Sequence, residues 1–146
     1  MSAFSLRFDV AVLLCAVFVL LALWHVYMAV SPGAGRGGAV PSVDGQPLFV
    51  PSRRATLAVA VALMLFAALV GATAGLVAVD VPSALLAGLS YTLALGLLAR
   101  AVGEFKYLGF FKRFRASRFA TLDTFVYSPL CLALAAGVAY VASARA

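Results

Sequence analysis

The sequence has little charge, a single histidine and only two cysteines. Of its 146 residues 11% are charged, and five acidic residues with one histidine leave few groups for acid–base or metal chemistry. It contains no CxxC or HExxH pattern, which argues against a zinc site built from protein ligands alone, and no glycine-rich phosphate loop follows a strand. We therefore expect no metal site, and the sequence identifies no cofactor.

The two cysteines do not predict a disulfide. Cys15 falls in the outer half of the first apolar run and Cys131 in the inner half of the last, so their expected depths in a membrane differ. Ser128, His25 and Asp123 supply the residue types of a Ser/His/Asp triad, but nothing in their spacing supports one.

Apolar residues are what the sequence has in abundance. They make up 65% of the chain and the mean hydropathy is +1.10, whereas soluble domains are nearer half apolar and a quarter charged. Lipid is therefore the expected solvent. The net charge of +6 does not indicate nucleic-acid binding, because the basic residues flank apolar runs instead of covering a soluble face.

The apolar runs predict an all-α, polytopic membrane protein. A bilayer core of about 30 Å needs about 20 helical residues, and four runs reach that length or approach it. The first run is too long for a signal peptide, and Trp24, Tyr27 and Met28 stand where a cleavage site needs small residues. We expect one membrane domain, 1–146, containing a four-helix bundle with helices at about 8–30, 55–79, 83–102 and 125–143.

Between the first two runs lies a loop, Ser31 to Pro51, with five glycines and four prolines. Its second half has two interpretations of equal weight, a fold onto the membrane surface or a solvated linker. Ser52 is a candidate N-cap for the second helix. Ala67, Gly71 and Gly75 place small side chains on one face, which favours packing within the monomer over a dimer seam.

Basic residues predict the orientation in the membrane. One side holds nine of the eleven, and the other holds Arg7 and Arg145. The positive-inside rule then places loops 31–51 and 103–124 in the cytoplasm and both termini outside, in a bacterial cytoplasmic membrane. The nine residues are Arg36, Arg53, Arg54, Arg100, Lys106, Lys112, Arg113, Arg115 and Arg118.

Charge, aromatic side chains and glycine are concentrated between Arg100 and Pro129. With this topology the inner end of the first helix arrives at the same depth, so a polar pocket is expected there. Its candidate catalytic or proton-handling residues are His25, Glu104 and Asp123. Its candidate ligand-binding residues are Trp24, Tyr27, Arg100, Lys106, Tyr107 and Tyr127. The alternative is that the aromatic residues anchor the interface and the basic ones contact headgroups.

The segment from Gly103 to Phe119 does not have the pattern of one surface helix. At 100° per residue its phenylalanines and its basic residues interleave instead of forming two faces. A helix broken near Gly109, or a structured basic and aromatic loop packed against the bundle, is the better interpretation.

Several motifs resemble one known family. They are GEFKYLGFFKR at 103–113, RFATLD at 118–123, YSPLC at 127–131, HVY at 25–27 and the loop pattern Pro41, Gly45, Leu48-Phe49 and 51–56. Together they resemble the DUF3995 family of small bacterial membrane proteins over nearly the whole chain. The resemblance also implies a tryptophan and a Gly-Gly-x-Trp segment after Tyr27, where this chain has Met28-Ala-Val-Ser-Pro. It supports the fold and the candidate residues but brings no activity.

Two functions of different classes remain open. The first is a site that binds or acts on a small amphiphile or lipid at the cytoplasmic end, for which His25, Glu104 and Asp123 would meet around a cavity. The second is a non-catalytic subunit or scaffold that docks its basic loop onto a partner or anionic lipid. For this the three residues would be satisfied locally and the loop exposed. Transport is weaker, because four unbroken helices would need to oligomerise. Protein partners and oligomeric state are not indicated.

Overall fold

The computed structural model describes residues 3–31, 33, 38–44 and 46–145, with side chains from Ser5 onward. Four helices are long and apolar enough to cross a membrane, which confirms the predicted all-α bundle. The only sheet in the described part of the chain is a hairpin of two antiparallel strands, each two residues long. The elements are α1 (Ala3–Val30), β1 (Ser42–Val43), β2 (Gln46–Pro47), α2 (Arg53–Ala74), α3 (Ser83–Val102), α4 (Arg118–Leu122), the π-helix η1 (Asp123–Tyr127) and α5 (Ser128–Ala142).

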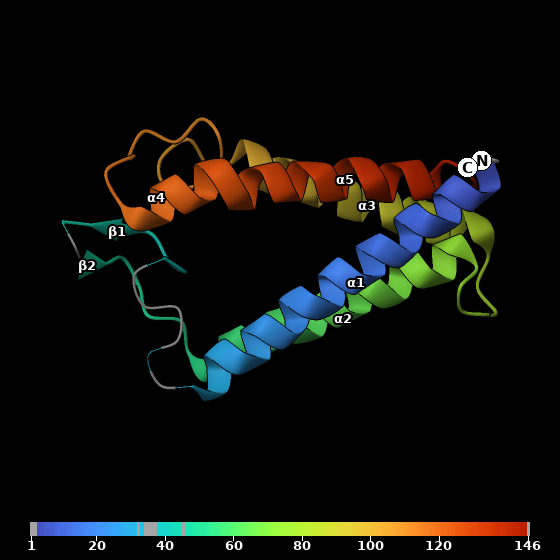
Figure 1. The fold of residues 1–146 in the computed structure, drawn as a ribbon, viewed down its shortest axis with the longest axis horizontal. Helices are drawn as coiled ribbons and strands as arrows, with labels where there is room; N and C mark the ends of the chain where they lie inside the picture. Colours follow the sequence, from blue (N-terminus) through green and yellow to red (C-terminus); the bar gives the residue numbers. More distant parts are fainter. Residues whose placement is uncertain (1–2, 32, 34–37, 45, 146) are drawn as a thin grey trace.

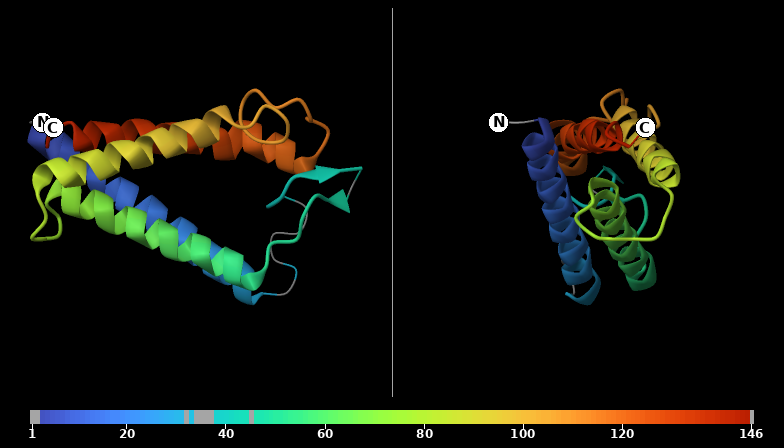
Figure 2. Two further views of the ribbon diagram at one scale, coloured as in Figure 1. Left: turned by 180° about the vertical axis from the view of Figure 1, so that it is seen from behind. Right: turned by 90° about the vertical axis from the view of Figure 1, so that its right-hand side faces the viewer.

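The helices form two pairs that together make a V (Figure 1). Helix α1 lies along α2, and α3 lies along the continuous rod of α4, η1 and α5. The pairs meet where α1 begins, α5 ends and residues 75–82 join α2 to α3, and we call this the turn end. They separate toward the opposite end, the loop end, where the hairpin lies close to α4 (Figure 2).

The best-packed part of the bundle is the half nearer the turn end. Phe18 is fully buried and its ring meets the Phe66 ring edge-on at 5.9 Å. Lipid is as apolar as these side chains, so close packing rather than exclusion of water stabilises the contact. The core consists of Ala11, Leu14, Phe18, Ala67, Val70, Leu93, Ala94, Leu134, Val138 and Val141.

Small residues let α2 approach α1 closely, as the sequence predicted. Ala67 is buried, and the Cys15 thiol of α1 donates a hydrogen bond to its carbonyl oxygen at 3.3 Å. A Cβ added to Gly71 would lie 3.8 Å from the same sulfur. The small face is therefore used within the chain.

Helix α2 begins directly after the predicted cap Ser52, at Arg53 instead of the expected Ala55, and it ends early. The Ser52 hydroxyl caps its start by accepting a hydrogen bond from the Ala55 N–H at 3.1 Å. The helix ends at Ala74, five residues before the predicted Val79, because Gly75 takes the left-handed conformation at φ 79° and closes the last turn. Apolar composition continues beyond that glycine, so hydropathy alone overestimated the length.

The fourth membrane helix begins at Arg118, not at the predicted Phe125. Its cap is Ser117, whose hydroxyl accepts from the Ala120 N–H at 3.1 Å. Pro129 lies within the rod and lacks the N–H that would bond the Phe125 carbonyl. The preceding residues widen into the π-turn η1, which accommodates the proline without ending the helix.

Residues 103–117 form an irregular loop closed by two glycines. Gly103 and Gly109 have φ of 86° and 84°, and their backbones lie against each other. A Cβ on Gly103 would overlap the Leu108 carbonyl, and one on Gly109 would overlap the Val102 carbonyl. The Phe110 N–H then bonds the Ala101 carbonyl at 2.9 Å, which fixes the loop exit beside the end of α3. The segment is thus a structured loop and not a helix.

Replacing Gly103 with alanine is expected to destabilise the protein. Its φ of 86° and ψ of −177° suit glycine almost alone, so alanine adds strain of about 1–3 kcal/mol besides the steric overlap. Thermal unfolding in detergent measures the effect. The control is Gly96→Ala in α3, where a Cβ meets nothing within 4 Å and alanine favours the helix. Equal unfolding temperatures for Gly103→Ala and wild type would show that the contact between Gly103 and Gly109 does not contribute to stability.

Candidate functional site

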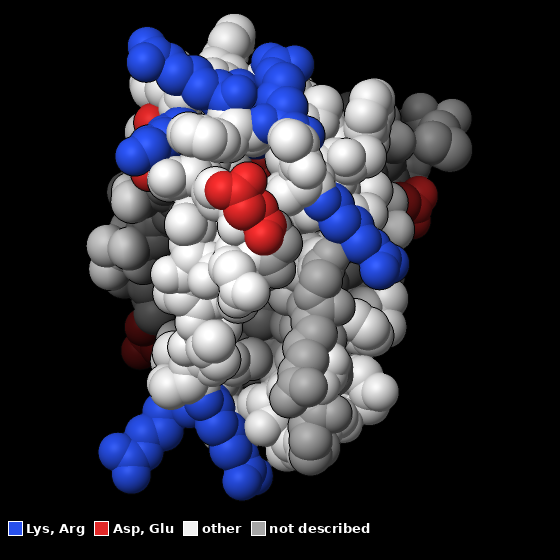
Figure 3. Space-filling view, turned by 90° about the vertical axis from the view of Figure 1, so that its left-hand side faces the viewer, with Lys and Arg blue, Asp and Glu red and all other residues white. Residues whose placement is uncertain are grey.

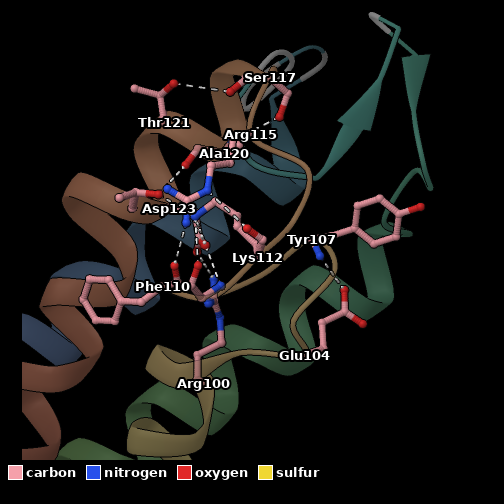
Figure 4. Close-up of polar contacts among 12 residues, drawn as sticks. Arg100, Glu104, Tyr107, Phe110, Lys112, Arg115, Ser117, Ala120, Thr121 and Asp123 are labelled. Carbon is pink, nitrogen blue, oxygen red and sulfur yellow. Dashed lines mark hydrogen bonds and ion pairs between the residues drawn. The ribbon is translucent and has the colours of Figure 1, made fainter.

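The carboxylate of Asp123, at the junction of α4 and η1, accepts three hydrogen bonds. It is fully buried. Its Oδ1 accepts from Arg100 Nη2 at 2.7 Å, and its Oδ2 accepts from the Gly109 N–H at 2.7 Å and from Lys112 Nζ at 3.0 Å (Figure 4). One carboxylate therefore joins the end of α3, the loop and the fourth helix.

Lys112 is buried to the same degree, with no exposed side-chain surface. An ammonium group has three hydrogens to donate, and all three are used. Besides Asp123, they reach the Gly109 carbonyl at 2.9 Å and Thr124 Oγ1 at 2.6 Å. Thr124 Oγ1 in turn donates to the Ala120 carbonyl at 3.0 Å. A buried lysine is tolerated only with this degree of pairing.

Arg100 completes the cluster from the last turn of α3. Its side chain is 34% exposed, so it lies at the edge of the cluster, whereas Asp123 and Lys112 lie inside it. Its Nη1 is buried and has no hydrogen-bond partner. We call Arg100, Lys112 and Asp123 the ion cluster; two cations share one anion, so it carries a formal charge of +1.

The ion cluster cross-links α3, the loop and the fourth membrane helix. Both oxygens of Asp123 accept hydrogen bonds from donors of the chain itself, so the carboxylate is held in place. The donors come from a helix end, a loop backbone and a loop side chain, which fixes the path of residues 103–117. The part of the chain that the structure describes holds no group of three His, Cys, Asp or Glu side chains able to bind a metal.

The candidate residues of α1 lie apart from the ion cluster. The His25 Nδ1–H donates to the Leu21 carbonyl of its own helix at 2.7 Å. Trp24 and Tyr27 are about half exposed, and their ring centroids lie 5.5 Å apart. Helix α1 ends on the other arm of the V (Figure 1). Within the described residues no hydrogen bond joins His25 to Glu104 or Asp123.

The candidate residues of the loop are satisfied locally. Glu104 is exposed, and its Oε1 accepts from the Tyr107 N–H at 3.2 Å. Lys106 Nζ lies 5.1 Å from the centre of the Tyr107 ring, which stacks on Phe114 at 5.2 Å. These contacts organise the outer surface of the loop.

Tyr127 connects η1 to the loop between α1 and α2. From η1 its hydroxyl donates to the Gly38 carbonyl at 3.0 Å, and a Cβ on Gly38 would press against Leu122 of α4. The hairpin segment is thereby held against the α4 side of the loop end. Arg36, which was assigned to the same side of the membrane, lies outside the described residues.

The sequence indicated Arg100 and Asp123 as candidates of a ligand site and not as an ion pair, and it did not indicate Lys112. Lys112 was grouped with the basic residues that contact headgroups, whereas the structure buries it. Thr124 and the Gly109 N–H were also missed. The available signal was the rule that ionisable groups near lipid pair with one another, but that rule does not say which lysine of several turns inward.

Replacing Asp123 with asparagine is expected to lower the free energy of unfolding by about 3–5 kcal/mol, because it leaves Lys112 buried without its counter-ion. In a double-mutant cycle, Lys112→Met combined with Asp123→Asn should cost clearly less than the sum of the single changes. Unfolding in mild detergent measures all three variants. The control is Asp80→Asn, which changes an exposed carboxylate in the turn. Additive costs would contradict the coupling.

A family model matches residues 18–138, a range that includes the ion cluster, the loop and most of the four helices. The description of that family is "Protein of unknown function (DUF3995)", in agreement with the motifs at 103–113, 118–123 and 127–131. No curated protein and no solved structure matches the chain. The chain is thus a multi-pass membrane protein that belongs to the DUF3995 family.

Proposed function

We propose that the protein is a non-catalytic membrane component that docks loop 103–118 onto anionic phospholipid headgroups. The observation that carries the proposal is the division of the loop into a buried and an exposed set of charges. Lys112 is satisfied inside the ion cluster, while the other basic residues of the loop are exposed. Among them, Arg115 also donates hydrogen bonds to the Lys112 and Phe110 carbonyls of the loop.

The exposed set has the chemistry of a membrane-contacting surface. We call it the loop surface. Aromatic side chains are favoured at the headgroup level, and each cation near an anionic surface contributes about 1 kcal/mol. Glu104 is the one exposed acid of residues 103–118, all of which are described. The loop surface consists of Phe105, Phe111 and Phe114 with Lys106, Arg113, Arg115 and Arg118.

The position of the loop surface supports the same function. It follows the last turn of a membrane helix, so it lies at the height where headgroups begin. In the view onto the loop end, lysine and arginine side chains project from more than one edge and outnumber the acidic ones (Figure 3). With the positive-inside rule we infer that this end faces the cytoplasm of a bacterial cell and that both termini lie outside.

A site for a small amphiphile on His25, Glu104 and Asp123 has less support. That hypothesis requires the three side chains to meet around a cavity. His25 instead bonds its own helix, Glu104 bonds the nearby Tyr107 N–H, and Asp123 is enclosed by donors from the chain. Local satisfaction with an exposed loop is the arrangement that the docking function requires.

The test is amide hydrogen exchange of residues 103–117 in nanodiscs of phosphatidylcholine, with and without phosphatidylglycerol. We expect slower exchange with phosphatidylglycerol, and a smaller difference at high salt because ions screen the attraction. The double variant Lys106→Gln/Arg113→Gln removes two of the four exposed cations of the loop surface, or about 2 kcal/mol of attraction, and should clearly reduce the difference.

The matched control is Arg53→Gln/Arg54→Gln, which removes the same charge from the exposed start of α2 at the same end of the molecule. This variant should exchange like wild type within residues 103–117. Exchange that does not depend on phosphatidylglycerol in the wild type would refute docking on anionic lipid.

A further inference from the structure

The turn end contains a pocket of about 500 Å³, well away from the loop surface. It is large enough for a small ligand or a lipid headgroup. Its basic groups are Arg7 from α1 and Arg145 from the residues after α5. Its remaining wall consists of Phe8, Thr73, Ala74, Val141 and Ala144. We call it the turn-end pocket.

Each arginine is held in place by a contact that leaves donors free. The Arg7 guanidinium lies over the Tyr140 ring, 5.4 Å from its centre. Arg145 Nε donates to the Thr73 carbonyl at 2.9 Å, near the end of α2, where helix carbonyls lack partners. The positions of both guanidiniums are therefore set by the protein, and within the described part of the chain each keeps nitrogen atoms without a hydrogen-bond partner.

Within the described side chains, those of residues 5–31, 33, 38–44 and 46–145, no carboxylate forms an ion pair with either of these two cations. Asp9 is exposed and only two positions from Arg7, so the two side chains do not share a helix face. The Nε of Arg7 is buried without a hydrogen-bond acceptor. A buried donor without an acceptor is unfavourable, and a bound oxyanion supplies both acceptors and counter-charge.

We propose that the turn-end pocket binds a phosphate-type oxyanion between Arg7 and Arg145. Guanidinium groups match phosphate geometry through forked pairs of N–H donors. The apolar wall and the position at the ends of the membrane helices favour the phosphate of an anionic phospholipid over a free ion. This site is independent of the loop surface, which lies at the opposite end of the molecule (Figure 1).

Native mass spectrometry of the protein with added phosphatidylglycerol or phosphatidylcholine tests the lipid source. We expect phosphatidylglycerol to be retained selectively by wild type. The variant Arg7→Gln/Arg145→Gln should bind it at least tenfold more weakly. Lys106→Gln/Arg113→Gln loses the same charge at the other end and should keep this adduct, so failure here and failure of loop docking are distinguishable.

Inorganic phosphate tests the free-ion source. In lipid-free detergent at constant ionic strength, phosphate should raise the unfolding temperature of wild type but not of Arg7→Gln/Arg145→Gln. The control variant Arg7→Lys/Arg145→Lys keeps both positive charges but loses the forked guanidinium donors. It should fold and bind phosphate with intermediate affinity. A selective response to either probe supports the oxyanion site and identifies its source. No response to either, or equal responses in wild type and the glutamine variant, overturns it.

Discussion

One buried carboxylate organises the loop end of this protein. Asp123 is reached by the end of α3 through Arg100 and by the loop through Gly109 and Lys112. Removing Asp123 would leave the buried Lys112 charge uncompensated, so the carboxylate holds the loop in this arrangement. The exposed aromatic and basic side chains depend on this arrangement, because the groups that fix the loop are inside and those available for contact are outside.

The parts of the fold that depend on local pattern were predictable. Four long apolar runs specify four membrane helices, and the serine before the second one specifies its start. The length of α2 was overestimated, because hydropathy does not register that Gly75 is in the left-handed conformation. The V was not predictable, since membrane depth places α1 and the loop at one level but does not say which helix pairs with which. That is why His25 was grouped with carboxylates that lie on the other arm.

The ion cluster was half predictable. Arg100 and Asp123 were both among the candidate residues, Arg100 as a ligand-binding residue and Asp123 as a catalytic one, but their pairing with each other was not predicted. Lys106 and Lys112 belong to the same basic segment, and composition cannot tell which is buried. The difference arises from the backbone, since the closure at Gly103 and Gly109 turns Lys112 inward and leaves Lys106 outside. Positive φ angles at two glycines are a three-dimensional property that a single sequence does not display.

The π-turn before Pro129 determines the direction in which Asp123 points. Each helical residue rotates the chain by about 100°, so the one additional residue in η1 offsets everything before it relative to α5. If the chain were one residue shorter there, the carboxylate would swing by that angle away from α3 and the loop. The rotational phase of the rod, and with it the charge pairing at one end of the bundle, is thus linked to how the helix accommodates a proline.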